Sequence, residues 1–304
     1  MIEVHNLSKR YGDILAVDDL SFTVPPGRVT GFLGPNGAGK TTTMRLILGL
    51  DHPSTGSATV AGQSYRDLPA PLREVGALLE AKAVHGGRSA ANHLLCLAQS
   101  NGIPKSRVKD VMDMVGLQSV ARRRAGSFSL GMGQRLGIAA ALLGDPAVLM
   151  FDEPVNGLDP EGILWIRNLL KSLAAEGRTV LVSSHLMSEM AVTADHLIVI
   201  GRGRLISDMS VHDFIRGSSR RSVRVRSPHA EQLAAVLSQA GGRVGLGADG
   251  SLDVHDLDNV AIGDLAAANR LTLHELTPQA ASLEEAFMEL TRDSVEYTAT
   301  GLPR

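Results

Sequence analysis

The 304-residue sequence has a single cysteine, few aromatic residues and no long apolar run. One cysteine, Cys96, excludes an internal disulfide, which is typical of a reducing compartment. Because Cys96 stands among leucine and alanine residues, we expect it to pack in the core. Aromatic residues make up only 3%, so aliphatic side chains must form most of that core. No segment approaches the roughly 18 apolar residues of a membrane-spanning helix, and residues 1–5 lack the features of a signal peptide.

The sequence also lacks a strong charge of either sign. Its formal net charge of −2 argues against a whole-chain electrostatic footprint for nucleic acid, so no nucleic-acid partner is expected. Apolar residues make up 44%, which is typical of globular proteins, and the length suits two domains. If a membrane is involved in the function, another chain must supply the spanning segments.

The most informative pattern is a glycine-rich loop, Gly-Pro-Asn-Gly-Ala-Gly-Lys-Thr, which begins at Gly34 and fits G-x-x-x-x-G-K-[ST]. The apolar run 29–33 predicts a buried strand before it, and apolar residues at helical spacing follow it. In this context the loop's N–H groups and the helix N-terminus are expected to bind phosphates, with Lys40 on the outer phosphates and Thr41 on Mg²⁺. A glycine-rich turn with a chance lysine would not explain the flanking strand and helix. The predicted nucleotide-binding residues are Gly34, Pro35, Asn36, Gly37, Ala38, Gly39, Lys40, Thr41 and Thr42.

Two acidic residues, Asp152 and Glu153, end the apolar run 147–151. Three apolar runs predict strands of a parallel sheet, at 147–151, 180–182 and 197–200. Helices expected at 160–175 and 186–194 alternate with these strands. Ligands of such sheets bind at the carboxyl ends of the strands.

There, Asp152 is expected to contact Mg²⁺ and Glu153 to act as the general base for the attacking water. Acids that merely cap a helix are the alternative. His185 could hydrogen-bond the γ-phosphate or the water, although a lone histidine is more often structural.

Residues outside this nucleotide core differ in character. Residues 1–33 are β-rich, residues 81–148 are helical, and a polar linker near 216–221 precedes a smaller C-terminal region. The C-terminal pattern predicts a β-α-β-β-α-β order, followed by a last helix. Its expected elements are strand 222–226, helix 229–240, a hairpin of 243–246 with 251–255, helix 258–268, strand 271–276 and helix 282–292.

Two features of these outer segments have more than one interpretation. Tyr11, in a polar segment expected to be a loop, could stack on a nucleobase or could be a partly buried tyrosine. Four arginines, at 220, 221, 224 and 226, form a row that alternates with Val223 and Val225. A solvated strand face is the favoured interpretation of that row, and contact with lipid head groups or nucleic acid is the minor one.

Taken together, these motifs resemble the nucleotide-binding subunit of an ABC transporter over about residues 1–215. The glycine-rich loop resembles Walker A, 150–154 resembles Walker B with its adjacent glutamate, 156–159 resembles the D-loop, and His185 resembles the switch histidine. The resemblance implies that Tyr11 stacks on adenine.

Residues 128–132 resemble the signature segment, with Leu130 and Met132 in place of its first glycine and its glutamine. The family's arrangement implies that Ser129, Gly131 and Asp159 act on ATP held by the other subunit. Glu80 takes the Q-loop position, where the family usually has glutamine, and a carboxylate there can ligate Mg²⁺.

Three features resemble the bacterial drug exporters of the bacitracin and daunorubicin type. They are the glutamate at position 80, the sequence Met-Gly-Gln-Arg-Leu at 132–136 and the C-terminal extension. This resemblance implies an α/β P-loop NTPase fold: a parallel-rich sheet core, a β-subdomain and a helical subdomain at about 81–148, all within 1–215. A small α+β domain at 216–304 would follow.

The implied function is ATP hydrolysis with Mg²⁺, by a head-to-tail dimer with itself or a related ATPase subunit. A separate membrane permease would export a drug, antibiotic or lipid-like substrate, with the chain at the cytoplasmic face of a bacterial membrane. The alternative is a soluble ABC-type ATPase acting on nucleic acid or the ribosome, which usually carries two nucleotide domains, a long coiled coil or metal-binding cysteines. A kinase or GTPase on the same loop would leave 128–135 and His185 unexplained.

Overall fold

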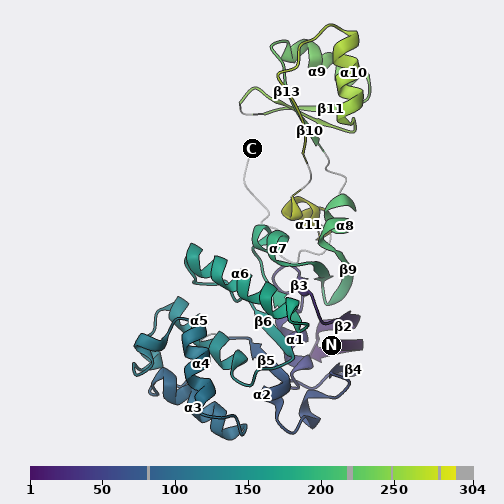
Figure 1. Ribbon diagram of the computed structural model, residues 1–304. Helices are drawn as coiled ribbons and strands as arrows, with labels where there is room; N and C mark the ends of the chain where they lie inside the picture. Colours follow the sequence, from purple (N-terminus) through teal and green to yellow (C-terminus); the bar gives the residue numbers. More distant parts are fainter. Residues whose placement is uncertain (81–82, 218–221, 248, 280–281, 292–304) are drawn as a thin grey trace. The chain divides into compact units, whose positions relative to one another are not determined.

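A computed structural model describes residues 1–80, 83–217, 222–247, 249–279 and 282–291 (Figure 1). The chain divides into two compact units, one built on residues 1–211 and the other on His212–Leu290. The described residues form two sheets in the first unit and one in the second, and each unit is described separately. Among the described residues, no helix is long and apolar enough to cross a bilayer.

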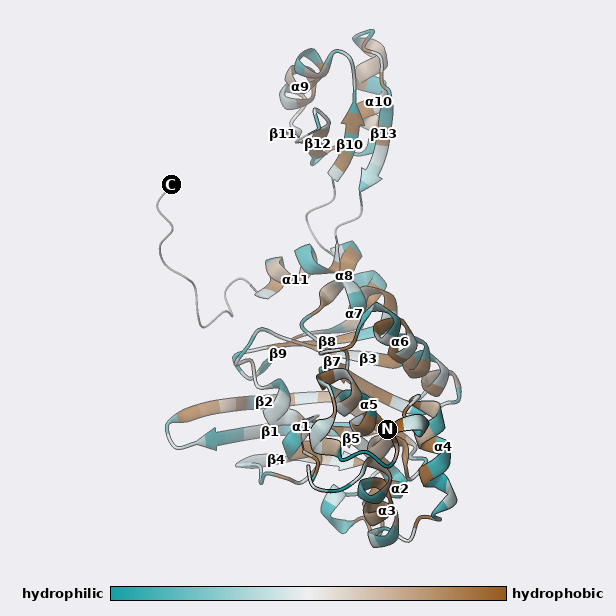
Figure 2. Cartoon of the chain, turned by 90° about the vertical axis from the view of Figure 1, so that its left-hand side faces the viewer, coloured by the Kyte–Doolittle hydropathy of each residue, from teal (hydrophilic) through white to brown (hydrophobic). Residues whose placement is uncertain are grey.

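The first unit is built around a six-stranded sheet in the order β5-β6-β7-β3-β8-β9. All neighbouring pairs are parallel except β8 with β9, which is antiparallel. The central strands are apolar and buried on both faces, as their hydrophobic colouring in Figure 2 shows, which is why they form the parallel core that the sequence predicts. The strands are β3 (Val29–Leu33), β5 (Val75–Leu78), β6 (Val148–Asp152), β7 (Thr179–Ser183), β8 (His196–Gly201) and β9 (Arg204–Ser210).

A second sheet of the first unit is antiparallel, in the order β2-β1-β4. Its strands are β1 (Ile2–Tyr11), β2 (Ile14–Val24) and β4 (Thr55–Val60). The prediction that Tyr11 lies in a loop is wrong, because β1 and β2 stay paired through several register shifts up to Tyr11 and Ile14. The polar residues there occupy the exposed end of a long hairpin.

Some helices of the first unit follow strands of the central sheet, whereas α3, α4 and α5 follow one another between β5 and β6. In α1, Met44 and Ile47 are fully buried, and burying such a side chain contributes about 1.5–3 kcal/mol. The helices are α1 (Lys40–Ile47), α2 (Pro71–Glu74), α3 (Ala90–Ser100), α4 (Ser106–Met114), α5 (Leu130–Leu142), α6 (Pro160–Ala175) and α7 (Met187–Thr193). The helices expected at 160–175 and 186–194 are therefore confirmed as α6 and α7.

Cys96 is exposed, which contradicts its expected place in the core. The buried residues of α3 include Ala90, Leu94 and Ala98, which recur every four residues on one face of the helix. Cys96 lies two residues from Leu94 and therefore points away from that face. Apolar neighbours along the sequence were a poor guide, because they are not neighbours around the helix.

The second unit has a four-stranded antiparallel sheet in the order β11-β12-β10-β13, with the core formed against α9 and α10. From β10 to β13 the elements follow the β-α-β-β-α-β order that the sequence predicts, with α8 before them and α11 after them. The elements are α8 (Val211–Gly217), β10 (Ser222–Arg226), α9 (Ala230–Gln239), β11 (Arg243–Leu246), β12 (Leu252–His255), α10 (Asn259–Ala268), β13 (Glu275–Gln279) and α11 (Leu283–Thr291).

One strand of this unit is displaced from the prediction. The sequence indicated a strand at 271–276, whereas β13 runs from Glu275 to Gln279 and includes Pro278. Proline disfavours a strand because it cannot donate a ladder hydrogen bond, but β13 lies at the sheet edge, where one side needs no partner.

The arginine row of the second unit is an ion-paired strand face. Arg224 and Arg226 both contact Asp249, and Arg226 Nε lies 3.4 Å from a Glu275 carboxylate oxygen. The arginines at 220 and 221 lie outside the described residues. These ion pairs favour the solvated-face interpretation over a lipid or nucleic-acid contact.

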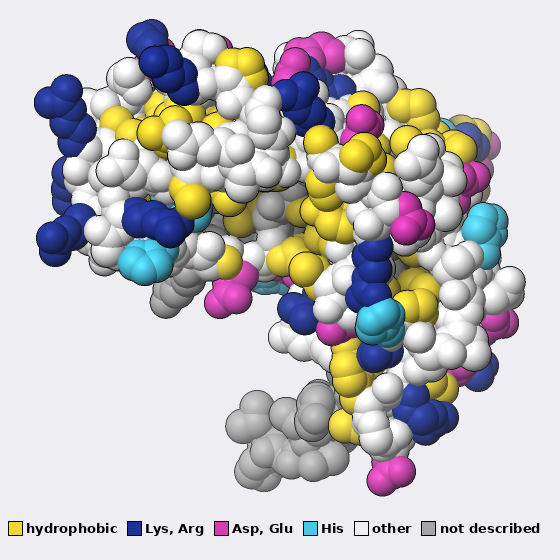
Figure 3. Space-filling view, turned by 90° about the horizontal axis from the view of Figure 1, so that it is seen from below, with side chains coloured by type: hydrophobic (Ala, Val, Ile, Leu, Met, Phe, Trp, Pro, Cys, Tyr) yellow, Lys and Arg dark blue, Asp and Glu magenta, His cyan; other side chains and the backbone are white. Residues whose placement is uncertain are grey.

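Figure 3 draws another face of the molecule, on which basic side chains are interspersed with acidic and hydrophobic ones.

Candidate functional site

The glycine-rich loop connects β3 to α1 and curls tightly against neighbouring backbone. A Cβ on Gly34 would lie 2.5 Å from the carbonyl oxygen of Ile200, and one on Gly39 would lie 2.4 Å from that of Ala16. Gly39 also has a φ of 100°, which side-chain-bearing residues rarely adopt. Glycine is therefore required at both positions.

The start of α1 is open to an anion. Gly39 is its N-cap residue and offers no side-chain acceptor to the first-turn N–H groups. These N–H groups and the helix dipole form the usual setting of a phosphate site.

Lys40 turns its ammonium group back into the loop. Its Nζ donates to the carbonyl oxygens of Gly34 at 2.6 Å and Pro35 at 3.2 Å. Burial lowers the pKa of Lys40, and the nearby charges of Glu153 and Asp152 act in the opposite direction. The charge of Lys40 thus stands inside the curl of the loop, where a bound phosphate would meet it.

Thr41 and Asp152 are brought together from separate elements, α1 and the carboxyl end of β6. Thr41 Oγ1 donates to Asp152 Oδ2 at 2.7 Å, and Ser183 Oγ at the end of β7 donates to the other oxygen, Asp152 Oδ1. A hydroxyl and a carboxylate are hard oxygen donors that suit Mg²⁺, which usually takes its remaining ligands from water and phosphate. The donor set therefore fits the predicted magnesium site. Sequence reasoning missed Ser183, whose only signal was its place at the end of an apolar run.

Glu153 and His185 form the second pair of the site. His185 Nδ1 lies 2.7 Å from Glu153 Oε2, although the two residues follow different strands, β6 and β7. The Glu153 carboxylate also lies close enough to Lys40 to act on its pKa. This geometry favours a joint role for Glu153 and His185 over the helix-cap and lone-histidine alternatives.

The backbone of Glu153 is unusual. Its φ of 52° lies in the left-handed region, which costs about 1–2 kcal/mol for a residue with a side chain. Its N–H donates to both Ser183 Oγ at 3.0 Å and Ser183 O at 3.3 Å. Strain of this kind persists only where surrounding contacts hold it, and it occurs most often at functional sites.

Most of these residues line one open cleft of about 310 Å³, whereas the predicted residues Gly34, Pro35 and His185 are not part of its lining. It is large enough for the phosphates of a nucleotide and is lined mainly by the glycine-rich loop. The lining residues are Ala16, Asn36, Gly37, Ala38, Gly39, Lys40, Thr41, Thr42, Asp152 and Glu153.

Several predicted site residues do not line this cleft. Tyr11 is 44% exposed and its hydroxyl bonds Asp51 at 2.8 Å, while Lys9 Nζ lies 4.8 Å from the centre of its ring. The acceptor Asp51 is itself held by Arg45, and these two contacts lower its pKa to about 2. Glu80 is exposed and follows the carboxyl end of β5.

The predicted signature and D-loop residues also lie outside the cleft. Ser129 caps α5, its Oγ accepting from Met132 N at 3.2 Å, and Asp159 caps α6, its Oδ1 accepting from Gly162 N at 2.9 Å. Gly131 lies against the D-loop, since a Cβ on it would be 2.7 Å from the carbonyl oxygen of Gly157.

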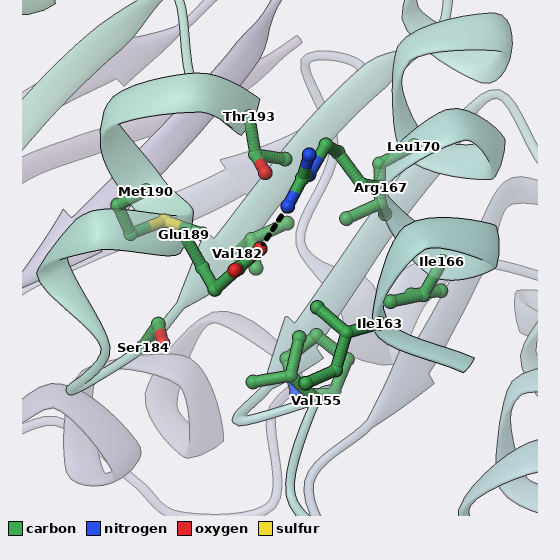
Figure 4. A pocket seen from close by; sticks show the side chains of 11 residues that line it. Val155, Ile163, Ile166, Arg167, Leu170, Val182, Ser184, Glu189, Met190 and Thr193 are labelled. Carbon is green, nitrogen blue, oxygen red and sulfur yellow. Dashed lines mark hydrogen bonds and ion pairs between the residues drawn. The ribbon is translucent and has the colours of Figure 1, made fainter. Parts of the chain in front are cut away.

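Behind the site, α6 and α7 are joined by an ion pair. Figure 4 shows Arg167 of α6 and Glu189 of α7 pointing toward each other, and the two side chains meet at 2.6 Å. The pocket around them measures only about 10 Å³, which is room for no more than one water. It is therefore a packing contact between the helices that follow the D-loop and His185.

Comparisons with known proteins agree with this site. A family model described as ABC transporter matches residues 17–156, and a domain of unknown function matches residues 221–284. The chain is 36% identical over 307 residues to an uncharacterized ABC transporter ATP-binding protein, YhcH, of Bacillus subtilis, with 97% of each chain covered. It is 33% identical over 308 residues to the bacitracin transport ATP-binding protein BcrA of Bacillus licheniformis, covering 95% of this chain and 97% of that protein.

Solved structures give the same result for the fold. The structure of an ATP-binding subunit of an ABC transporter matches with a TM-score of 0.66 at 27% identity, covering 71% of this chain and 92% of that one. A dimeric cassette bound to ADP and phosphate matches with a TM-score of 0.64 at 21% identity, covering 69% of this chain and 99% of that one. The predicted P-loop NTPase fold is confirmed, and the protein is an ATP-hydrolysing member of the ABC transporter ATP-binding family.

Proposed function

We propose that this chain uses ATP hydrolysis to drive export of a drug, antibiotic or lipid-like compound through a separate membrane permease. It would act at the cytoplasmic face of a bacterial membrane. The observation that carries the enzymatic part is the meeting of Thr41, Asp152, Glu153 and His185 at the carboxyl ends of parallel strands. Relatives named for bacitracin, lantibiotic and Nod factor transport support the export part, and no observation favours action on nucleic acid or ribosomes.

Within the site, the loop N–H groups and Lys40 would bind the phosphates of ATP. Thr41 and Asp152, with Glu80 as a further oxygen donor, would hold Mg²⁺, which supplies charge neutralisation at the β- and γ-phosphates. Glu153 would accept a proton from the attacking water, and His185 would hold the Glu153 carboxylate toward that water. Tyr11, whose side chain is exposed, would stack on adenine.

The Glu153→Gln variant tests the catalytic part. It keeps the shape of the side chain but removes the basic oxygen, so ATP should bind with unchanged affinity while turnover falls by about 10²–10⁴-fold. Nucleotide affinity can be read from a fluorescent ATP analogue and turnover from phosphate release. Near-normal hydrolysis by this variant would remove Glu153 from its assigned role.

The signature and D-loop residues are proposed to act in trans, in a dimer with a second copy or a related subunit. This is supported by the position of Ser129, Gly131 and Asp159 outside the chain's own nucleotide cleft, with Ser129 at the N-terminus of the 13-residue helix α5. The domain assignments stay proposals of the same kind: an ATPase domain at 1–215 with a helical subdomain near 81–148, and an α+β domain at 216–304.

Dimer formation can be tested by light scattering on Glu153→Gln protein with ATP and Mg²⁺. Adding Ser129→Arg should keep the protein monomeric while leaving ATP binding intact, whereas the control Ser100→Arg, at the exposed end of α3, should not prevent dimerisation. If Ser129→Arg instead weakens ATP binding by the monomer, the residue acts on its own chain's nucleotide and the in-trans arrangement is wrong.

A further inference from the structure

A buried glutamine of the signature helix contacts the backbone of the proposed catalytic residue. Gln134 on α5 is only 3% exposed, and most of its neighbours on the helix are apolar. Its side-chain Nε2 donates to the carbonyl oxygen of Glu153 at 3.1 Å. Gln134 is not among the residues that line the nucleotide cleft, and this hydrogen bond joins it to the backbone of Glu153, which is.

The bond falls on the peptide that determines where the Glu153 carboxylate points. Glu153 has a φ of 52°, and its N–H is held by Ser183. Its carbonyl oxygen accepts from Gln134 and also, at 3.2 Å, from Asn156 N in the following turn. The residue is therefore fixed on both sides of its Cα, by β7 on one side and α5 on the other.

Helix α5 is closely packed on both sides of this contact. Its first turn meets the D-loop backbone directly, since a Cβ on Gly131 would lie 2.7 Å from Gly157 O. Farther along, a Cβ on Gly137 would lie 2.5 Å from Leu78 Cδ1 of β5. The helix is thus closely packed on both sides of Gln134, which holds the Gln134 backbone within reach of Glu153.

We propose that Gln134 is a positioning residue for catalysis: its amide holds the Glu153 carbonyl so that the left-handed backbone directs the carboxylate at the phosphate cleft. The proposal rests on the catalytic role assigned to Glu153 above. Because Ser129 caps the same helix, Gln134 also links the segment proposed to contact the partner's nucleotide to the catalytic carboxylate of its own chain.

The first test is Gln134→Met, which keeps length and helix preference but removes the amide. We expect kcat to fall at least about tenfold while KM and the affinity for a fluorescent ATP analogue stay within about twofold, the pattern of an interaction used only in the transition state. The control is Thr179→Val, which removes a buried hydroxyl with no hydrogen-bond partner among the described residues and should leave kcat unchanged. Unchanged kcat in Gln134→Met, or a loss confined to ATP binding, would overturn the proposal.

The second test separates positioning from ordinary stabilisation. In a Glu153→Gln background, Gln134→Met should cause no further loss of turnover, because its effect passes through the Glu153 carboxylate. A further tenfold loss in the double variant would show a general structural role and overturn the proposal. If Glu153→Gln alone hydrolyses ATP normally, the catalytic role of Glu153 fails and the proposal with it. If Glu153→Gln is slow but Gln134→Met is unimpaired, only the proposal fails.

A third variant gives a readout that packing alone would not change. Gln134→Glu is isosteric, and its carboxyl group can donate to the Glu153 carbonyl only when protonated. The ratio of its kcat to the wild-type kcat should therefore rise as pH falls, whereas the ratio for Gln134→Met should stay flat. Two flat profiles would contradict the hydrogen bond as the cause.

Discussion

Replacing Gly157 by alanine should destabilise the first unit chiefly because of Leu130. Gly157 has a φ of 75°, and a Cβ there would lie 2.4 Å from both Cγ and Cδ2 of Leu130. The left-handed backbone costs a residue with a side chain about 1–2 kcal/mol, and overpacking costs about 1–3 kcal/mol more. We therefore expect Gly157→Ala to lose about 2–5 kcal/mol of unfolding free energy.

Leu130→Gly should relieve the clash in the double variant. Leu130 is 52% exposed, so on its own this change should cost only about 1 kcal/mol, mainly in helix propensity. In the Gly157→Ala background it should recover the overpacking cost, giving a favourable coupling of about 1–3 kcal/mol between the two sites. Leu130, which departs from the signature glycine, and Gly157 of the D-loop would then be a matched pair.

The single tryptophan makes this measurable in one unit. Trp165 lies on α6 of the first unit, with the Arg135 guanidinium of α5 at 4.7 Å from its ring centre. Urea unfolding followed by its fluorescence reports on the first unit without interference from the second. Additive effects of the two substitutions, within about 0.5 kcal/mol, would refute the pairing of Leu130 with Gly157.

Three further predictions follow from the same geometry. Lys40→Ala should abolish ATP binding, because it removes the only lysine in the cleft lining; binding of a fluorescent ATP analogue within about twofold of wild type would contradict this role. Arg167→Met should cost about 1–2 kcal/mol in the Trp165 assay by leaving the half-buried Glu189 unpaired, and Arg167→Met with Glu189→Leu should recover most of it. The pKa of His93 is lowered by burial and then by the charges of Arg88 and His85. Folding therefore favours the neutral imidazole, and the stability present above pH 6.5 is lost as the pH falls through the lowered pKa. The urea midpoint of the first unit should therefore fall less between pH 7.5 and pH 5 in His93→Leu than in wild type, and equal falls would exclude His93 as a cause.

Most of the site could be predicted because its parts are either local or placed by a sheet rule. The glycine-rich loop is contiguous, and Asp152, Glu153 and His185 follow strands whose apolar runs indicated a parallel sheet. The contacts of Ser183 and Gln134 could not be predicted in this way. Both contacts depend on how α5 and β7 approach the turn after β6. The sequence around a single polar residue beside an apolar stretch does not indicate which residue it will contact.

The errors have the same origin. Cys96 was placed in the core from its sequence neighbours, although the direction around the helix decides its exposure. The sequence predicts that the last strand of the second unit ends before Pro278, because proline disfavours a central strand. That this strand lies at the sheet edge is a property of the whole sheet and cannot be seen in the segment. The sequence predicts a loop at Tyr11 because the register shifts along this hairpin have no simple sequence signal.

The most direct test of the account is purification of tagged Glu153→Gln protein from detergent-solubilised membranes of its own host, with ATP and Mg²⁺. The Lys40→Ala variant, which should not bind ATP, serves as the matched control. The account predicts that a membrane protein with several spanning helices copurifies in stoichiometric amount with Glu153→Gln and that ATP increases its recovery. Recovery of ribosomes or nucleic acid, without such a membrane protein, would contradict a role in transport.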